Sequence, residues 1–350
     1  MGDVKKAVRM PGDEHVGGDH GIGIVIGTLD IGGTKVAAMV ADRTGPLARM
    51  TEPTVKSGAP DALARQLVAL LDRAACKAGI PAEAIDAVGV SACGPFTALD
   101  GKLALATPNI CGGLAAESVL PNDWTALPLE AILAQRYRRV EIRNDCVAAL
   151  LGERTFGAAT GEPNCVYVTW STGVGFGLCV DGHLLAGKHG NAGHAGHMLM
   201  APEGRTRCGC GNLGDLESLI SGVHITRGLG LSTQALFEAA RNGDAAARER
   251  VMAAAAWLGR ALYNLVATLD TRLFIIGGSV WQHHGDWLAP LVQQEISSRF
   301  PALTGGVTLQ APALDSVVAD VGAACLVMPP SWQAEWHANA PWTRLAAMSA

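Results

Sequence analysis

The sequence predicts an α/β protein with two similar domains and a cleft between them. In segment 21–45 (GIGIVIGTLDIGGTKVAAMVADRTG), two apolar runs flank a glycine-rich bend and a turn signal follows, a pattern typical of a β-hairpin. Segment 165–182 (CVYVTWSTGVGFGLCVDG) repeats this arrangement in the second half of the chain. The repetition indicates an internally duplicated protein.

Helical patterns come after both hairpins and lead into further strands. Residues 60–78 and 244–269 have apolar side chains at intervals of three and four residues, as amphipathic helices do. Strand-like apolar runs come next, at 87–93 and 272–280. Strands and helices therefore alternate in both halves. The domain boundary is expected near 145–165, where a helical run is followed by a Gly/Pro/Asn-rich link.

The composition argues against two classes of partner. Of the 350 residues, 49% are hydrophobic and 17% are charged, yet no apolar run approaches the roughly 18 residues that a membrane span needs. The formal net charge of -5 provides no basic field for a nucleic acid.

Nine cysteines, mostly single among apolar residues, are typical of reduced thiols. Residues 1–21 lack the apolar middle of a signal peptide, so we expect a flexible tail on a cytoplasmic protein.

Three glycine-containing segments are candidates for nucleotide binding: DIGGTK at 30–35, STGVGFG at 171–177 and IIGGSV at 275–280. Glycine lets backbone N–H groups approach a phosphate, and the side chains of Thr34 and Lys35 add donors. Each segment alone also fits an ordinary turn. The first is not a Walker loop, because a strand rather than a helix follows it. The ordered set of three predicts a nucleotide held between the two halves.

Asn144 and Asp145 lie between the strand-like run VEI and a helical run. Asn and Asp are favoured residues at the beginning of a helix, where they cap free backbone N–H groups. On spacing alone, capping is the simpler interpretation of this pair.

Together these motifs resemble the ROK family (repressors, open reading frames, kinases) of actin-like sugar kinases, from about Val25 to about Val327. The resemblance implies two ribonuclease H-like (actin-like) domains with an interdomain cleft, and a homodimer. The domains expected from it are 22–145 and 146–316, with a zinc-type loop at 190–218, a helix around 317–330 that packs back on the first domain, and a C-terminal tail at 331–350.

The resemblance also implies roles for individual residues. Asp145 would be the general base that accepts the proton of a sugar hydroxyl. ATP, accompanied by Mg²⁺, would be bound by Asp30, Gly32, Gly33, Thr34, Lys35, Ser171, Thr172, Gly173, Gly175, Gly277 and Gly278. The sugar pocket would contain Gly94, Asn109, Asn144, His194 and His197, near Glu217. From the residues alone, Asn109 would be taken for an ordinary turn residue.

In ROK proteins a segment of the form C-x-C-G-x-x-G-C, with an upstream His, binds a structural zinc ion. Here His197, Cys208 and Cys210 match three of the ligands, and Asp215 stands where the third Cys would be. Zinc accepts carboxylate oxygen, so a Cys₂HisAsp site is expected to retain the metal, less tightly than the family's set. In the alternative interpretation, hydrogen bonds of Asp215 and neighbouring backbone replace the zinc.

A second departure concerns the sugar pocket. The glutamate of the family's E-x-G-H motif corresponds to His194. A carboxylate only accepts hydrogen bonds, whereas a neutral imidazole has one donor and one acceptor. If His194 is not simply a spare residue in a glycine-rich loop, the exchange predicts an altered substrate: an amino sugar such as kanosamine, a ketose or a sugar-like cyclitol in place of glucose.

The resulting prediction is an ATP-dependent kinase that phosphorylates the primary hydroxyl of a hexose-like substrate. The alternatives are a sugar-sensing ROK-type regulator and a non-catalytic sugar-binding protein. ROK regulators carry an additional DNA-binding domain, whereas only about twenty residues precede the resemblance here. Glycosidase chemistry needs two carboxylates at a sugar and no nucleotide segments, so it is disfavoured.

Overall fold

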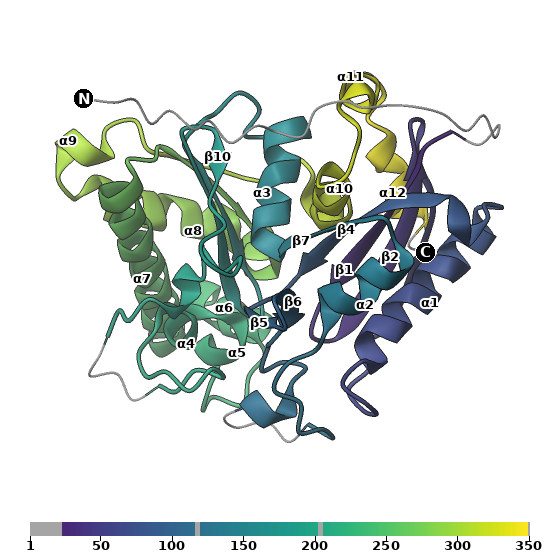
Figure 1. Cartoon of the computed structure of the whole chain (residues 1–350). Coiled ribbons are helices and arrows are strands. Elements are labelled where there is room, and N and C mark those ends of the chain that lie inside the picture. The colour runs from purple at the N-terminus through teal and green to yellow at the C-terminus, as the bar shows by residue number, and fades with distance from the viewer. Residues whose placement is uncertain (1–22, 116–119, 202–205, 349–350) are drawn as a thin grey trace, which may run out of the picture.

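Two five-stranded sheets with the same topology form the two halves of the protein (Figure 1). The strand order is β3-β2-β1-β4-β7 in the first sheet and β10-β9-β8-β11-β12 in the second. In each sheet three antiparallel strands continue into parallel pairings. The repeated order confirms the predicted α/β class and the duplication. The computed structural model describes residues 23–115, 120–201 and 206–348, so the expected tail at 1–21 lies outside the described residues.

The elements of the first half are β1 (Val25–Ile31), β2 (Lys35–Asp42), β3 (Gly45–Pro53), α1 (Ala62–Lys77), β4 (Ile85–Ala92), β5 (Phe96–Leu99), β6 (Lys102–Leu105), α2 (Leu129–Arg136) and β7 (Arg139–Asn144). Those of the second half are α3 (Asp145–Phe156), β8 (Cys165–Trp170), β9 (Val174–Val180), β10 (His183–Leu184), α4 (Leu216–Ile220), α5 (Gly222–Ile225), α6 (Thr233–Arg241), α7 (Ala245–Leu269), β11 (Leu273–Gly277), α8 (Ser279–Ser297), α9 (Pro301–Thr304) and β12 (Thr308–Gln310). The chain ends with α10 (Val318–Cys325), α11 (Pro330–Asn339) and α12 (Leu345–Met348).

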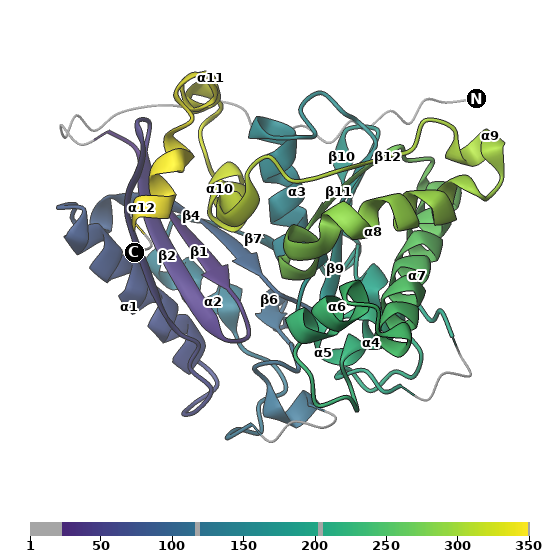
Figure 2. The ribbon, with the colours of Figure 1, turned by 180° about the vertical axis from the view of Figure 1, so that it is seen from behind.

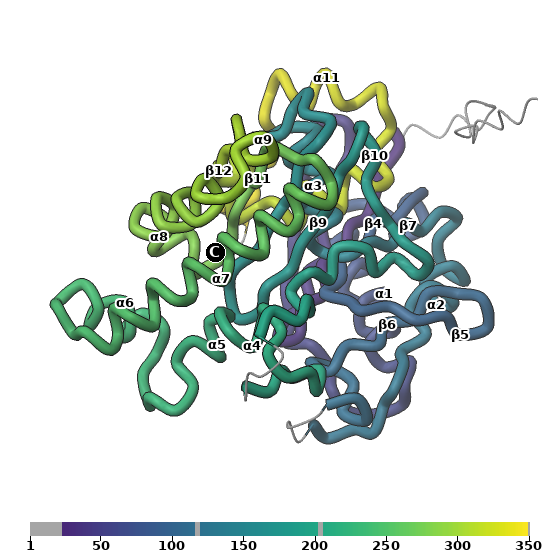
Figure 3. The backbone as a smooth tube through the Cα atoms, turned by 90° about the vertical axis from the view of Figure 1, so that its left-hand side faces the viewer, coloured from purple at the N-terminus to yellow at the C-terminus, as the bar shows by residue number. Residues whose placement is uncertain are grey.

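Helices and sheets alternate in five layers, which Figure 1 shows side by side. The first sheet lies between α1 and α2 on its outer face and α10 on its inner face. The second sheet lies between α3 on its inner face and α7 and α8 on its outer face, where Figure 2 shows α8 crossing the sheet. Figure 3 views the molecule from the side on which α7 and α8 cover the second sheet. Because both faces are covered, the central strands are apolar almost throughout.

The predicted helices follow their apolar periodicity. In α1 the buried side chains include Leu63, Leu67 and Leu71, at four-residue intervals that face the first sheet. Helix α7 begins after Asp244, whose carboxylate accepts a hydrogen bond from the backbone N–H of Ala247 at 2.9 Å. Both helices therefore match the predicted segments to within two residues.

Helices α3 and α10 cross closely between the two sheets, and glycines permit this. A Cβ atom on Gly322 of α10 would lie 2.3 Å from the carbonyl oxygen of Ala148 in α3. A Cβ atom on Gly89 of β4 would lie 1.9 Å from the carbonyl oxygen of Ala323. Helix α10 also contacts β1, so the helix expected around 317–330 does pack against the first sheet.

Two sequence-based expectations differ from the structure. The strand predicted at 272–280 ends at Gly277, because Gly278 has a φ of 89° and Ser279 already begins α8. The segment 331–350, expected to be a tail, is folded as far as it is described: α11 places Trp336 in a core that also contains Met39. Trp336 is fully buried, and its Nε1 donates to the carbonyl oxygen of Asp42 at 3.3 Å. Alternating polar residues around its tryptophans conceal this packing in the sequence.

Among the described residues, no helix combines the length and the apolar character that would be needed to cross a membrane.

Candidate active site

Two hydrogen bonds to or from Gly32 fix the bend between β1 and β2. The N–H of Gly32 donates to the carbonyl oxygen of Lys35 at 3.0 Å, and the Thr54 hydroxyl donates to the carbonyl oxygen of Gly32 at 2.8 Å. A Cβ atom on Gly33 would lie 2.9 Å from Cβ of Asn109, so Gly33 permits that loop to approach. The side chains of Thr34 and Lys35 are exposed and available to a ligand.

Three carboxylates interact where the first sheet faces α3 and α10. Asp30, at the end of β1, accepts a hydrogen bond from the Ser91 hydroxyl at 3.0 Å. Burial raises the pKa of Asp30 to about 7, and the negative charges of Asp320 and Asp145 add to this effect. Asp320 accepts from Nε of Arg49 at 3.0 Å. Oxygen ligands with surplus negative charge suit a divalent cation such as Mg²⁺.

Asn144 and Asp145 occupy the junction between β7 and α3. The side-chain oxygen of Asn144 caps α3 by accepting from the N–H of Cys146 at 3.0 Å, so the capping interpretation holds for Asn144. The same N–H donates to Oδ1 of Asp145 at 2.8 Å. Burial raises the pKa of Asp145, although this hydrogen bond opposes the shift. A carboxylate with a raised pKa is suited to accept a proton.

Asn144, Gly94 and His194 come together although they lie far apart in the sequence. A Cβ atom on Gly94 would lie 3.0 Å from Nε2 of His194 and 3.3 Å from Nδ2 of Asn144. Nε2 of His194 is buried and has no hydrogen-bond partner among residues 23–115, 120–201 and 206–348. Burial lowers the pKa of His194 to about 4, with a smaller effect of His197, so the imidazole is neutral near pH 7. A buried, unpaired ring nitrogen beside an amide is ready to bind a polar ligand.

Asn191 is a residue of this site that the sequence analysis missed. Its side-chain amide makes two hydrogen bonds to the backbone of Phe96, accepting from the N–H and donating to the carbonyl oxygen, both at 2.7 Å. It thereby ties the loop before His194 to the loop that contains Gly94. An Asn among glycines and alanines gave no sequence signal, because its partner lies 95 residues away.

The bend between β8 and β9 has a backbone hydrogen bond of its own, and the strand after it contacts Cys146. Its N–H at Ser171 donates to the carbonyl oxygen of Gly173 at 2.9 Å, which closes the turn. Cys146, the neighbour of Asp145, lies against the strand beyond this bend: its Sγ is 2.7 Å from where a Cβ on Gly175 would be. Asp145 thus interacts with Asp30 beside the first bend and is next to the residue that contacts the second.

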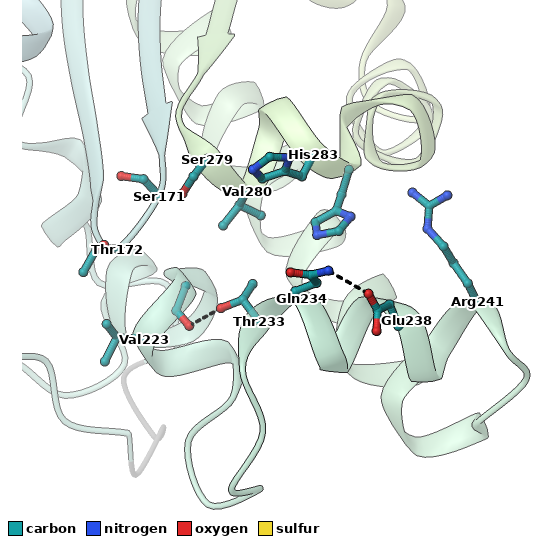
Figure 4. A pocket seen from close by; sticks show the side chains of 12 residues that line it. Ser171, Thr172, Val223, Thr233, Gln234, Glu238, Arg241, Ser279, Val280 and His283 are labelled. Atoms are coloured by element: carbon teal, nitrogen blue, oxygen red, sulfur yellow. Dashed lines mark hydrogen bonds between the residues drawn. The ribbon is translucent and has the colours of Figure 1, made fainter. Parts of the chain in front are cut away.

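The third glycine segment meets the second bend at a cavity of about 510 Å³. Gly278 has a φ of 89°, and a Cβ atom on it would lie 2.5 Å from the carbonyl oxygen of Trp170. Gly277, the preceding residue, ends β11. Figure 4 shows Ser171, Thr172 and Ser279 on one side of the cavity and residues of α6 on the other. Two of the three predicted glycine segments therefore border one cavity.

The four candidate zinc ligands converge. The ligand atoms of His197, Cys208, Cys210 and Asp215 all lie within 4.8 Å of one another. Nδ1 of His197 is 3.0 Å from Oδ2 of Asp215 and 3.6 Å from Sγ of Cys210. The hydrogen bond with Asp215 raises the pKa of His197. Burial opposes ionisation of Asp215, but its hydrogen bonds to His197 and Ser218 outweigh burial and lower its pKa to about 2.

Asp215 serves two structural purposes at once. Its Oδ1 accepts from the N–H of Ser218 at 2.9 Å and caps α4, while Oδ2 faces His197. Glu217 connects this loop to the second bend, because its Oε2 accepts from the N–H of Val174 at 2.9 Å and its Oε1 from the Cys208 thiol at 3.4 Å. Two sulfurs, one imidazole and one carboxylate fit the ligand preferences of Zn²⁺.

Comparison with known proteins gives a consistent assignment. The model of the ROK family matches residues 26–328. The N-acetylmannosamine kinase of Salmonella newport (strain SL254) is 34% identical over 259 residues, which are 72% of this chain and 82% of that protein. The ROK hexokinase of Thermus thermophilus is 31% identical with a TM-score of 0.72, covering 87% of this chain and 97% of that one.

A glucokinase of the same family from Streptomyces griseus, solved with glucose and AMPPNP, is 28% identical with a TM-score of 0.62, covering 87% of this chain and 99% of that one. The family match spans most of the chain, and the first relative exceeds 30% identity over more than two thirds of it. The chain therefore belongs to the ROK family.

Proposed function

We propose that this protein transfers the γ-phosphoryl group of ATP to the primary hydroxyl of a 2-acetamido hexose of the N-acetylmannosamine type. That the chain is an ATP-dependent carbohydrate kinase follows from relatives of that activity. The narrower substrate rests on the N-acetylmannosamine kinase at 34% identity and on His194. Since these relatives are named as kinases, a ROK regulator or a silent sugar-binding protein has less support.

His194 is the observation that carries the substrate proposal. The carbonyl oxygen of an acetamido group only accepts hydrogen bonds, so a carboxylate cannot bind it, whereas a neutral imidazole can donate to it. Nε2 of His194 is buried beside Gly94 and Asn144 and lacks a partner among the described residues. A sugar hydroxyl, which both donates and accepts, can also pair with Nε2, so the preference for the acetamido group rests on the related N-acetylmannosamine kinase together with the loss of the carboxylate.

In the proposed reaction, the carboxylate of Asp145 accepts the proton of the attacking hydroxyl. The new bond joins the sugar oxygen to the γ-phosphorus, the bond between the γ-phosphorus and the bridging oxygen breaks, and ADP leaves with that electron pair. Asn144 and Asn109 orient the sugar. Thr34 and Lys35 in the first bend, with the backbone N–H groups of both bends, bind phosphate oxygens.

Two metal ions belong to the proposal. Mg²⁺, when bound with ATP, neutralises charge on the phosphates, and the carboxylate of Asp30 offers the oxygen ligand that it prefers. Zn²⁺ would be held by His197, Cys208, Cys210 and Asp215, whose donor atoms are close enough for one ion. The zinc would stiffen the loop that carries His194 and Glu217. Glu217 in turn holds Val174 of the second bend.

The ROK resemblance supports two further parts of the proposal. We infer a homodimer, which light scattering of the purified protein would test, and a cytoplasmic location, which fractionation of cells would test. Neither inference affects the assignment of the reaction.

The deciding experiment measures kcat/KM with ATP for N-acetylmannosamine, N-acetylglucosamine, glucose and kanosamine. We expect the highest value for N-acetylmannosamine. His194→Glu should shift the ratio of kcat/KM values towards glucose, because it exchanges a donor for an acceptor. A preference for glucose in the wild type, or a ratio that His194→Glu leaves unchanged, would refute the substrate proposal. Absence of ADP formation with every sugar would refute the kinase reaction itself.

A further inference from the structure

The cavity beside the second bend has two chemically different ends. Near the bend it is bordered by Ser171 and Thr172, and by Ser279 in the first turn of α8, a helix of 19 residues. Hydroxyl groups and a helix N-terminus favour the phosphates of a nucleotide. The opposite end is formed by α6 and by the histidines of α8, and Figure 4 shows Gln234, Glu238 and Arg241 there. The base of a nucleotide bound in this direction would reach α6.

The side-chain amide of Gln234 has a defined orientation at this end. Its Nε2 donates to Oε1 of Glu238 at 2.8 Å, one helical turn further along α6. A carboxylate has no proton to donate, so the NH₂ group of Gln234, not its oxygen, must face Glu238. Figure 4 shows the amide oxygen of Gln234 turned away from Glu238. The acceptor Oε1 of Gln234 is therefore the amide atom that points away from Glu238.

His284 adds a second polar group to the same wall. Its residue is 9% exposed, and Nδ1 is buried without a hydrogen-bond partner among the described residues. The imidazole ring stacks on Phe237 with 3.8 Å between ring centroids and 5° between planes, which holds its orientation. The guanidinium of Arg241, by contrast, already pairs with Asp286 at 3.1 Å. His284 thus retains an unused hydrogen-bonding atom in the cavity wall.

We propose that Gln234 and His284 read the base of the nucleotide and select adenine over guanine. Oε1 of Gln234 accepts from the exocyclic amino group of adenine, and Nδ1–H of His284 donates to ring nitrogen N1. Guanine presents a carbonyl oxygen where adenine has the amino group and an N–H where adenine has N1, so both contacts would become mismatches. Glu238 does not touch the base. It acts as a positioning residue that keeps the Gln234 amide in the orientation for adenine.

This inference rests on the proposed kinase function, and its test separates the two. With the best sugar substrate, kcat/KM is measured for ATP and for GTP in the wild type, Gln234→Leu, Glu238→Gln and His284→Phe. We expect the wild type to prefer ATP by more than about tenfold. Gln234→Leu should raise KM for ATP by about fivefold and leave KM for the sugar unchanged. His284→Phe keeps an aromatic ring on Phe237 and should have a similar effect on KM for ATP.

Glu238→Gln gives the most specific test. An amide at position 238 can accept or donate a hydrogen bond, so the side-chain amide of Gln234 is free to flip. The preference for ATP over GTP should fall by about fivefold through better use of GTP, with kcat for ATP retained. Glu249→Gln, the same change at another exposed helical position, is the control and should not alter the ratio. Active wild type with equal use of ATP and GTP, or a Glu238→Gln ratio equal to that of the control, overturns the base-reading proposal. Loss of activity with both nucleotides in the wild type overturns the kinase function instead.

Discussion

Asp145 shows how one side chain acquires a role from its surroundings. Alone, it is a second polar residue at the beginning of a helix, next to the actual cap Asn144. In the folded protein it is removed from water and shares its environment with Asp30, whose charge it also influences. The combination gives a carboxylate that is more basic than usual, interacts with Asp30 and is next to Cys146, which contacts β9.

At the residue scale, Asp145→Asn should reduce kcat by at least about 100-fold, since it removes the proton acceptor at constant size. A carboxylate can accept a proton only when it is deprotonated. Because burial raises the pKa of Asp145, kcat/KM should decrease with decreasing pH at a higher pH than the ordinary pKa of an aspartate would predict. Steady-state kinetics over a pH series, with calorimetry of sugar binding, would test this. Activity retained in Asp145→Asn would exclude the residue as base, whereas lost sugar binding would show that it serves binding.

At the scale of single elements, the irregular loop before α4 holds several of the candidate site residues. It carries His194 and the four candidate zinc ligands, and Glu217 joins it to the second bend. Its described part has two isolated bridges, Leu199 with Asp215 and Arg207 with Leu213, and further backbone hydrogen bonds, but no regular strand ladder. A metal ion at the four candidate ligands would add cross-links between the two ends of this loop.

For this element we expect metal analysis of protein purified without added zinc to find about one zinc ion per chain. Cys210→Ser should lose most of the zinc and raise KM for the sugar, because the loop that positions His194 loosens. Cys76→Ser, at an exposed cysteine outside the loop, is the matched control. Wild-type protein with little zinc, and no difference in KM between the two variants, would favour the alternative in which hydrogen bonds of Asp215 close the loop.

At the scale of the whole molecule, the C-terminal segment completes the first half. Trp332 and Trp336 of α11 pack with Ile26, Met39 and Ala41 from the first sheet, on the side where α10 also lies. The end of the chain thus covers a surface formed by its beginning. The two halves are joined by this return as well as by the crossing of α3 and α10.

Trp336→Ala should lower the free energy of unfolding by about 3–5 kcal/mol, since it empties a fully buried site and removes the hydrogen bond to Asp42. Phe300→Ala, at an aromatic residue that is 61% exposed, should change it by less than about 0.5 kcal/mol. Urea denaturation followed by circular dichroism would measure both. Equal effects of the two changes would mean that α11 contributes no core.

The fold was largely predictable because its signals are local. Apolar runs placed β1 and β2, apolar positions at intervals of three and four residues placed α1 and α7, and glycine-rich segments placed the bends. The resemblance to the ROK family, rather than spacing alone, led to the expectation that His197, Cys208, Cys210 and Asp215 converge, and their ligand atoms do lie close together. Asn191, the α11 tryptophans and the pair of Gln234 with His284 escaped prediction, because each depends on a partner that is remote in sequence or belongs to another element.

The sequence by itself determined the alternation of strands and helices and the three glycine segments, since these follow from neighbouring residues and their spacing, whereas the candidate metal ligands and the exchange of glutamate for His194 came from its resemblance to the ROK family. Only the tertiary structure decided which groups share a site: Asp30 with Asp145, His194 with Asn144, and α6 with the second bend. The physical reason is that burial and unpaired polar atoms, which make a side chain reactive or selective, arise from packing between segments that the linear order keeps apart.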